Sequence, residues 1–149
     1  MIIVLEGPDL AGKTTFAREL EADGFEYHHS GPLKGSAKKA YLDPLDGMAT
    51  GDHVLDRWHL GELIYGPMLR GESKVGPKLL NEIETQLTAL GALRLIVTAP
   101  FEVIRDRYAR RGDDLLSLDQ IERVHAFYDA WLEQDTRWKR IERFGYVDA

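Results

Sequence analysis

Cysteine is absent from this sequence of 149 residues. Disulfide bonds, thiolate metal sites and cysteine nucleophiles are therefore excluded. No apolar stretch is long enough to span a bilayer, and the polar loop that follows the short apolar run after Met1 does not have the shape of a signal peptide. We therefore expect a cytoplasmic protein without a membrane partner.

The sequence also has no excess of positively charged residues. The net charge of −6 and the isoelectric point near 5.4 argue against a broad electrostatic surface for nucleic acid, although they leave room for a local basic patch. Internal repeats, low-complexity tracts and linkers are absent too, and the length suffices for one substantial hydrophobic core. We predict a single domain that spans residues 1–149.

Short apolar runs alternate with segments of helical periodicity. Strands are predicted at residues 2–5, 24–28, 53–55, 93–98 and 141–147. Helices are predicted at 13–20, from 60 to a stop or bend at Gly66-Pro67, at 77–90, at 101–111 and from 118, with a loop and then a helix within 31–47. Ser117 and Gln120 form a capping-box pattern before the last helix. The alternation predicts an α/β fold with a mostly parallel sheet covered on both faces.

A phosphate-binding loop follows the first predicted strand. Its residues match G-x-x-x-x-G-K-[ST] in full: Gly7, Pro8, Asp9, Leu10, Ala11, Gly12, Lys13 and Thr14. Glycines allow backbone N–H groups to turn toward phosphate oxygens, and the helix that begins at Lys13 directs its positive end at the same anion. We expect residues 7–15, including Thr15, to bind a nucleoside triphosphate. Lys13 would contact the β and γ phosphates, and Thr14 would bind Mg²⁺.

The rest of the sequence narrows the class of nucleotide-binding protein. GTPases of the Ras type read guanine through an Asn-Lys-x-Asp motif, and the single asparagine, Asn81, lies in a leucine-rich helix without that motif. Motor and AAA-type ATPases need a much longer chain. Small phosphotransferases remain.

An acid and a base stand together at the end of a later strand, in His53-Val54-Leu55-Asp56-Arg57. Ligands of parallel sheets collect at the carboxyl ends of the strands, so this pair should lie beside the phosphate loop. Asp56 would share Mg²⁺ with Thr14, and Arg57 would face the acceptor, where a guanidinium can bind a phosphate through two hydrogen bonds.

At these residues the sequence resembles the thymidylate kinase and deoxynucleoside kinase group of P-loop kinases, including its phage-type members. The resemblance rests on the Gly-x-Asp-x-x-Gly-Lys-Thr loop, on Asp56-Arg57-Trp58 followed by Tyr65-Gly66, and on the segments "LIVTAPFEVIRDRYARRGDD" and "IERVHAFYDAWL". It covers most of the chain. It implies a three-layer P-loop NTPase fold with about five parallel strands in the order 2-3-1-4-5.

The resemblance also implies roles for individual residues. Asp9 would contact the acceptor's sugar hydroxyl, and Arg57 would bind the acceptor's phosphate or position its reactive hydroxyl. An arginine-rich lid near residues 105–116 would stabilise charge on the transferred phosphoryl group. Its candidates are Arg105, Arg107, Arg110 and Arg111, with Arg107 and Arg111 preferred.

The sequence departs from this group after the second strand. Where thymidylate kinases carry Arg-Glu-Pro-Gly, this chain reads "YHHSGPLKG". Where nucleoside kinases carry a glutamate base, the nearest acid is Glu26. His28 and His29 are alternatives, either as contacts to the acceptor or as structural residues. Trp58, Tyr65 and Tyr128 would stack on a base or belong to the core.

Three functions follow from these patterns. The first is an ATP- and Mg²⁺-dependent kinase that phosphorylates a pyrimidine deoxynucleotide or deoxynucleoside. The second is a kinase of a 5-hydroxymethylpyrimidine base, such as 5-hydroxymethyluracil, within DNA, with Lys34, Lys38 and Lys39 facing the DNA backbone. The third is a nucleotide-binding regulator without turnover. A homodimer is compatible with each of them.

Overall fold

The computed structural model describes residues 1–113 and 115–143. Its elements in chain order are β1 (Ile2–Glu6), α1 (Lys13–Ala22), β2 (Glu26–His29), α2 (Ala37–Tyr41), the 3₁₀ helix η1 (Asp43–Met48), β3 (His53–Asp56), α3 (His59–Arg70), α4 (Pro77–Ala89), β4 (Leu93–Thr98), α5 (Phe101–Arg111), α6 (Leu118–Gln134) and β5 (Trp138–Glu142). The strands form one parallel sheet in the order β2-β3-β1-β4-β5. The three-layer α/β fold and the strand order 2-3-1-4-5 are therefore confirmed.

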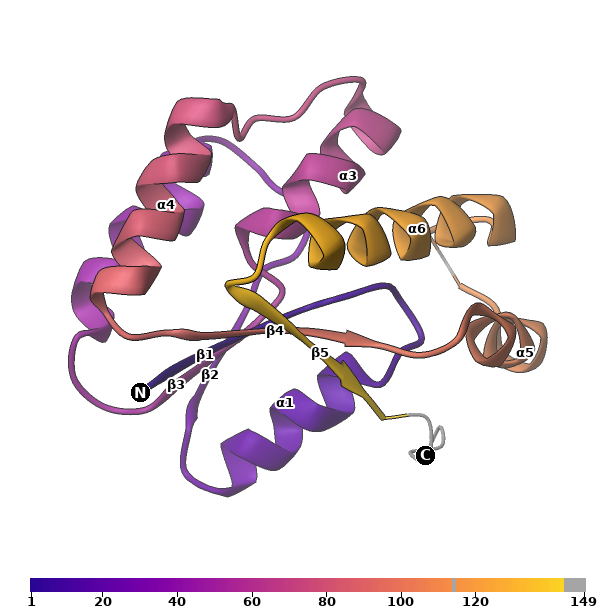
Figure 1. The fold of residues 1–149 in the computed structure, drawn as a ribbon, viewed down its shortest axis with the longest axis horizontal. Helices are drawn as coiled ribbons and strands as arrows, with labels where there is room; N and C mark the ends of the chain where they lie inside the picture. The colour runs from indigo at the N-terminus through magenta and orange to yellow at the C-terminus, as the bar shows by residue number, and fades with distance from the viewer. Residues whose placement is uncertain (114, 144–149) are drawn as a thin grey trace.

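The helices cover the two faces of the sheet unequally, as Figure 1 shows. Helix α1 lies on one face, and α3, α4 and α6 lie on the other, while α5 follows the carboxyl end of β4. Strand β1 is buried along its whole length. Its residues alternate between the two faces, so a continuous apolar run is what this central position requires.

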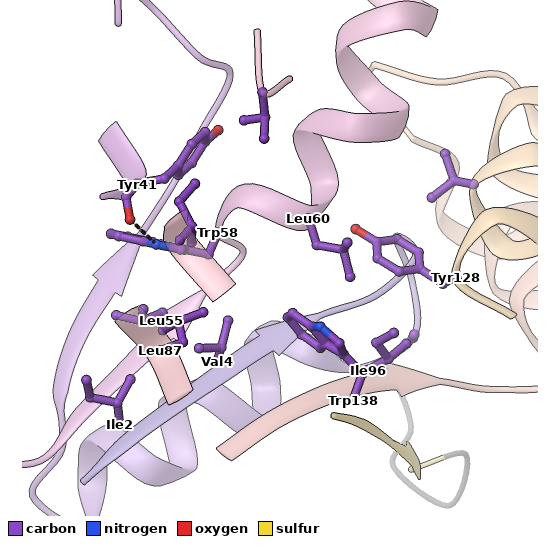
Figure 2. Close-up of a cluster of buried hydrophobic side chains, with 14 of the residues drawn as sticks. Ile2, Val4, Tyr41, Leu55, Trp58, Leu60, Leu87, Ile96, Tyr128 and Trp138 are labelled. Atoms are coloured by element: carbon purple, nitrogen blue, oxygen red, sulfur yellow. Dashed lines mark hydrogen bonds between the residues drawn. The ribbon is translucent and has the colours of Figure 1, made fainter. Parts of the chain in front are cut away.

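Two clusters of buried side chains form the core. The smaller cluster lies under α1 and joins Ile3, Leu5, Val54 and Val97 to Ala17. The larger cluster fills the opposite face, and Figure 2 shows its members around β1, β3 and β4. They include Val4, Leu55, Leu60, Ile96, Tyr128 and Trp138. In this cluster the indole Nε1 of Trp58 donates a hydrogen bond of 2.9 Å to the carbonyl oxygen of Tyr41. That bond ties α2 to the turn after β3.

The last strand lies earlier in the chain than predicted. Strand β5 runs from Trp138 to Glu142 and pairs with β4 from Arg94 to Thr98, whereas residues 144–147 of the predicted strand lie outside the described residues. The strand is instead anchored at its first residue, because the side chain of Trp138 is only 2% exposed.

Helix α3 continues through Gly66-Pro67 to Arg70, so of the predicted stop or bend at that dipeptide, the stop is wrong. Pro67 removes one amide donor, but the next turn still closes, because the N–H of Gly71 donates to the carbonyl of Pro67 at 3.1 Å. Gly71 has a left-handed φ of 88°, which ends the helix four residues later than expected. The other shared bounds differ from the prediction by at most two residues, and the capping box of Ser117 and Gln120 is confirmed.

None of the helices in the described part of the chain is both long and apolar enough to cross a membrane.

Candidate active site

The loop between β1 and α1 has the backbone that a phosphate cradle needs. Gly7 has a φ of 145°, and a Cβ atom there would lie 2.0 Å from the carbonyl oxygen of Val97. Gly12 has a left-handed φ of 89° and precedes the first turn of α1. Any other residue at position 7 would collide with β4, so the close packing of loop on strand requires glycine.

Leu10 is one of two described residues other than glycine with a positive φ, at 69°. Its carbonyl oxygen accepts a hydrogen bond of 2.7 Å from Nη1 of Arg107, which is buried on α5. This contact joins the predicted lid to the phosphate loop across 97 positions of sequence. Arg111, the other preferred lid arginine, lies exposed at the end of the same helix. Position 114 of the predicted lid lies outside the described residues.

Asp56 lies against the start of α1, at the carboxyl end of β3. Its Oδ1 is 2.6 Å from Nζ of Lys13, and its Oδ2 accepts a hydrogen bond of 3.2 Å from the hydroxyl of Thr14. The hydroxyl of Tyr27, on β2, also donates to Oδ2. The carboxylate is fully buried, whereas Thr14 is exposed. Asp56, Lys13 and Thr14 therefore meet at the open side of the loop.

Charge and burial oppose each other in this group. Burial raises the pKa of Asp56, but the ammonium of Lys13 and the hydroxyl of Tyr27 outweigh it, so the pKa lies below its usual value. Burial and the nearby guanidinium of Arg57 lower the pKa of Lys13 against the pull of Asp56. An incoming anion would raise the pKa of Lys13 again.

Arg57 points to the other side of the loop. Its Nη2 donates a hydrogen bond of 2.9 Å to Oδ1 of Asp9, and the same oxygen accepts one of 3.0 Å from the hydroxyl of Tyr65. The guanidinium also lies over the ring of Tyr65, 4.6 Å from its centroid. Its Nη1 is buried and has no hydrogen-bond partner among the described residues. Arg57 has a φ of 67°, so its backbone is held in the left-handed region.

Asp9 is also in contact with the segment that follows α5. Burial raises the pKa of Asp9, but Arg57, a hydrogen bond with Asp113 and the hydroxyl of Tyr65 bring it below its usual value. Burial raises the pKa of Asp113, and the neighbouring carboxylate of Asp9 raises it further. Asp113 in turn accepts hydrogen bonds from the N–H groups of Leu115 and Leu116, at 2.8 and 2.7 Å. Asp9 and Asp113 therefore form a carboxyl pair that joins loop and lid, in which the pKa of Asp9 is lowered and that of Asp113 is raised.

Glu6 supports the turn between β3 and α3 from beneath. It is fully buried at the end of β1. Its Oε2 accepts hydrogen bonds from the backbone N–H groups of Trp58 and Gly61, at 3.0 and 3.1 Å, and its Oε1 accepts one of 3.1 Å from Tyr128. The side chain thus caps the first turn of α3, which has no cap from its own residues.

A pocket of about 230 Å³ opens beside Asp9 and Arg57. Its charged side chains are Asp9, Arg57, Glu62 and Arg70. Its walls are largely apolar and aromatic, and they include Pro32, Leu33, Tyr41, Trp58, Tyr65, Leu69 and Leu115. A few converging polar groups within apolar walls are typical of a small-molecule site.

The two histidines after β2 separate into different environments. His29 lines the pocket, and its Nδ1 lies 3.5 Å from Oδ2 of Asp56. His28 instead pairs with His53, with 3.1 Å between the two ring nitrogens, and Glu26 lies beside them. Glu26 therefore does not occupy the place of the glutamate base. Of the predicted stacking residues, Trp58 and Tyr65 line the pocket, whereas Tyr128 is fully buried against Glu6.

The donors at Thr14 and Asp56 suit Mg²⁺. A hydroxyl and a carboxylate, with oxygens 3.2 Å apart, are hard ligands of the kind that Mg²⁺ takes together with phosphate oxygens and water. The exposure of Thr14 leaves room for those further ligands.

Four side chains in or beside the candidate site were not predicted from sequence. Glu6 ends an otherwise apolar strand, and that single acid was the available signal. Tyr27 and Asp113 carry no local pattern that points to the loop, and Arg70 lies within a helix. Glu6 directly precedes the loop in the chain, whereas Tyr27, Asp113 and Arg70 reach the site through the packing of elements far apart in the chain.

Comparisons with known proteins find matches to this chain among solved structures. No family model matches it, and no curated protein matches it. The YorR protein of Bacillus subtilis, solved in complex with phosphorylated GDP, has a TM-score of 0.80 and 21% identity, and the match covers 99% of this chain and 88% of that one. Deoxyadenosine kinase of M. mycoides with bound dATP has a TM-score of 0.58 and 15% identity, covering 99% of this chain and 93% of the other. The same kinase with the products dCMP and dCDP has a TM-score of 0.57.

These similarities are in the path of the backbone along nearly the whole chain. Together with the strand order and the Gly7–Thr14 loop, they show that this protein has the three-layer α/β P-loop fold that it shares with deoxyadenosine kinase.

Proposed function

We propose that this protein is an ATP-dependent kinase that transfers the γ-phosphoryl group to a pyrimidine deoxynucleotide or deoxynucleoside. One observation carries the proposal. The adjacent residues Asp56 and Arg57 point to opposite sides of the phosphate loop, Asp56 to Lys13 and Arg57 to Asp9 and the pocket. A donor site and an acceptor site therefore share one wall.

The donor's phosphates lie on the N–H groups of residues 7–15, at the positive end of α1. Lys13 leaves Asp56 to bind the β and γ phosphates, so that the phosphates replace the carboxylate as the partner of the buried ammonium. Thr14 and Asp56 hold Mg²⁺, which neutralises charge on the phosphate oxygens when bound.

The acceptor occupies the pocket beside Asp9. Because the pKa of Asp9 is lowered, its carboxylate is ionised at neutral pH and accepts a hydrogen bond from the acceptor's hydroxyl. The unpartnered Nη1 of Arg57 binds an acceptor oxygen, on a phosphate or on the reacting hydroxyl. The Tyr65 ring holds this guanidinium in place from one face.

Transfer then needs one bond to form and one to break. The acceptor's hydroxyl oxygen attacks the γ phosphorus, and the bond to the β,γ-bridging oxygen breaks. ADP leaves with that electron pair, and the hydroxyl proton passes to Asp9. Residues 105–116 act as the lid of a single domain, with Arg107 holding the loop at Leu10 and Arg111 closing over the moving charge.

The pocket and the structural neighbours support the substrate class. The pocket's volume of about 230 Å³ fits a small molecule. The preference for a pyrimidine comes from the resemblance of the sequence to the thymidylate kinase and deoxynucleoside kinase group. Deoxyadenosine kinase of M. mycoides, which was solved with dATP, dCTP and dCMP, supports a deoxynucleotide or deoxynucleoside.

An acceptor screen with ATP labelled at the γ position tests the proposal. We expect labelled product with pyrimidine deoxynucleosides or their monophosphates, in the presence of Mg²⁺, and none with Lys13→Ala. ATP consumption that stays the same with every acceptor would contradict a kinase and favour a nucleotide-binding regulator.

A base within DNA remains a second candidate acceptor because of the segment that borders the pocket. Residues 31–33 line it, and the exposed side chains of Lys34, Lys38 and Lys39 follow directly. Duplex DNA that contains 5-hydroxymethyluracil belongs in the same screen. Only a DNA acceptor should show a rate that falls steeply with salt, because its binding releases counterions.

A further inference from the structure

A second polar cluster lies on the edge of the sheet, away from the nucleotide loop. Glu26 and His28 are alternate residues of β2, so their side chains share one face. His53 begins β3 and is in register with Glu26. Asp56 stands three residues further along β3, which is about 10 Å along a strand, and its side chain points to the α1 face. The cluster is therefore separate from the site described above.

The three side chains converge on one point. Nε2 of His28 and Nδ1 of His53 are 3.1 Å apart. An oxygen of Glu26, Oε2, lies 3.3 Å from that Nδ1 and 3.9 Å from that Nε2. In a tetrahedral zinc site with bonds of about 2.0–2.1 Å, neighbouring ligand atoms lie about 3.3 Å apart. The observed triangle is close to one face of such a tetrahedron.

The orientation of His53 is already that of a metal ligand. Its Nε2 lies 2.7 Å from the carbonyl oxygen of Thr50, to which it donates. That bond places the hydrogen on Nε2 and leaves the lone pair of Nδ1 directed at the cluster. Binding of the second ring nitrogen to a backbone carbonyl is the usual arrangement that orients a metal-binding histidine. The imidazole is buried, so this orientation is held by packing as well.

We propose that Glu26, His28 and His53 form a binding site for a divalent transition-metal ion of the zinc class. Two imidazoles and one carboxylate suit Zn²⁺ and its neighbours rather than Mg²⁺ or Ca²⁺, which prefer oxygen ligands. Without metal, His28 donates to His53; with metal, the hydrogen of His28 moves to its Nδ1 through solvent, so both lone pairs face the ion. The exposed side of Glu26 leaves the fourth position to water.

The ion would stabilise the edge of the sheet. Strand β2 has four residues and, in the part of the chain that the structure describes, pairs with β3 alone. A metal bound by both strands adds a second link between them at their amino ends. This role does not depend on the proposed kinase activity.

Zinc titration of the intact protein tests the proposal. The protein is freed of metal, and Zn²⁺ is added in excess Mg²⁺ in competition with a chromophoric chelator. We expect one Zn²⁺ per chain. Glu26→Gln and His28→Gln should each weaken binding by about tenfold or more, whereas Glu122→Gln, an exposed carboxylate on α6, should bind as the native protein does. Both cluster variants change partly exposed side chains and should fold; His53→Gln, which changes a buried one, serves only as a supplement.

Two further readouts make the outcome decisive. Co²⁺ in place of Zn²⁺ should give the strong visible absorption of a tetrahedral site, and that absorption should be lost in His28→Gln. Zn²⁺ should raise the Tm of the native protein and of Glu122→Gln but not that of His28→Gln, because only a ligand of the folded state stabilises it. Absence of zinc binding in excess Mg²⁺, or an affinity in both cluster variants equal to that of the native protein, would overturn the assignment.

Discussion

Arg57 combines an unusual backbone with a side chain aimed at the pocket, and two substitutions separate these properties. Arg57→Ala and Arg57→Gly both remove the guanidinium and its 2.9 Å bond to Asp9. They differ in the backbone, because the φ of 67° is unfavourable for alanine and neutral for glycine. The glycine variant should therefore be more stable than the alanine variant, by about 1 kcal/mol.

Both variants should show a similar fall in kcat/KM for the acceptor. The Nη1 atom of Arg57 is buried without a partner among the described residues, so an acceptor oxygen there gains a charge-assisted hydrogen bond. Such a bond contributes about 1.5–3 kcal/mol. At 1.4 kcal/mol for each tenfold change, kcat/KM for the acceptor should fall by about 10- to 150-fold. The affinity for ATP should change little, since Lys13, Thr14 and Asp56 stay in place.

Steady-state kinetics with each substrate varied in turn, and urea unfolding of both variants, measure these effects. Arg140→Ala is the control, because this arginine of β5 lies outside the pocket and pairs with Asp129 of α6 and Glu142 of β5. A loss confined to ATP affinity would show that Arg57 belongs to the donor site. A glycine variant less stable than the alanine variant would show that the left-handed backbone is not a source of strain.

Three further substitutions test other parts of the site and core. Lys13→Ala should lower the rate of transfer by about 100-fold or more while circular dichroism shows a folded protein; normal turnover would refute the loop assignment. Asp113→Asn should raise the free energy of unfolding at pH 7. The raised pKa of Asp113 means that its carboxyl is harder to ionise beside Asp9 in the folded protein than in the unfolded chain, and asparagine removes this cost. An unchanged urea midpoint would argue against that contact. Glu84→Gln should destabilise the protein at pH 7 by about 3–5 kcal/mol, because it leaves Arg94 buried without its carboxylate partner; equal stability of the variant would show that the pair contributes nothing.

The pH dependence of the last variant has a definite sign. Burial raises the pKa of Glu84, but His59 and Arg94 outweigh it, so the pKa in the folded state lies below its usual value. The native carboxylate therefore stabilises the fold above about pH 4.5, and this contribution is lost as the pH falls through the lowered pKa. Urea unfolding between pH 7 and pH 3 should show a smaller loss of stability for Glu84→Gln than for the native protein.

Local patterns were sufficient for the elements that carry a strong signal. The Gly7–Thr14 motif, the apolar strands and the Ser117 capping box each lie within a few consecutive residues, so the sequence alone shows them. The strand order was predicted from the resemblance to the thymidylate kinase and deoxynucleoside kinase group, which rests in part on the loop motif. Sequence patterns gave the wrong bounds for elements that depend on contacts with residues far apart in the chain. Strand β5 begins at Trp138, whose side chain is buried in the core. Helix α3 continues beyond Pro67, because the N–H of Gly71 closes the following turn.

The sequence by itself therefore determined a parallel α/β chain with a phosphate loop, and it named Lys13, Thr14, Asp56 and Arg57 as neighbours of that loop. Only the tertiary structure decided the direction in which each side chain points. Asp56 and Arg57 are adjacent in sequence, yet the left-handed backbone at Arg57 turns one to Lys13 and the other to Asp9. Tyr27, Asp113 and the Glu26–His28–His53 cluster likewise arise from the alignment of separate elements, because contacts between residues far apart in the chain have no local pattern.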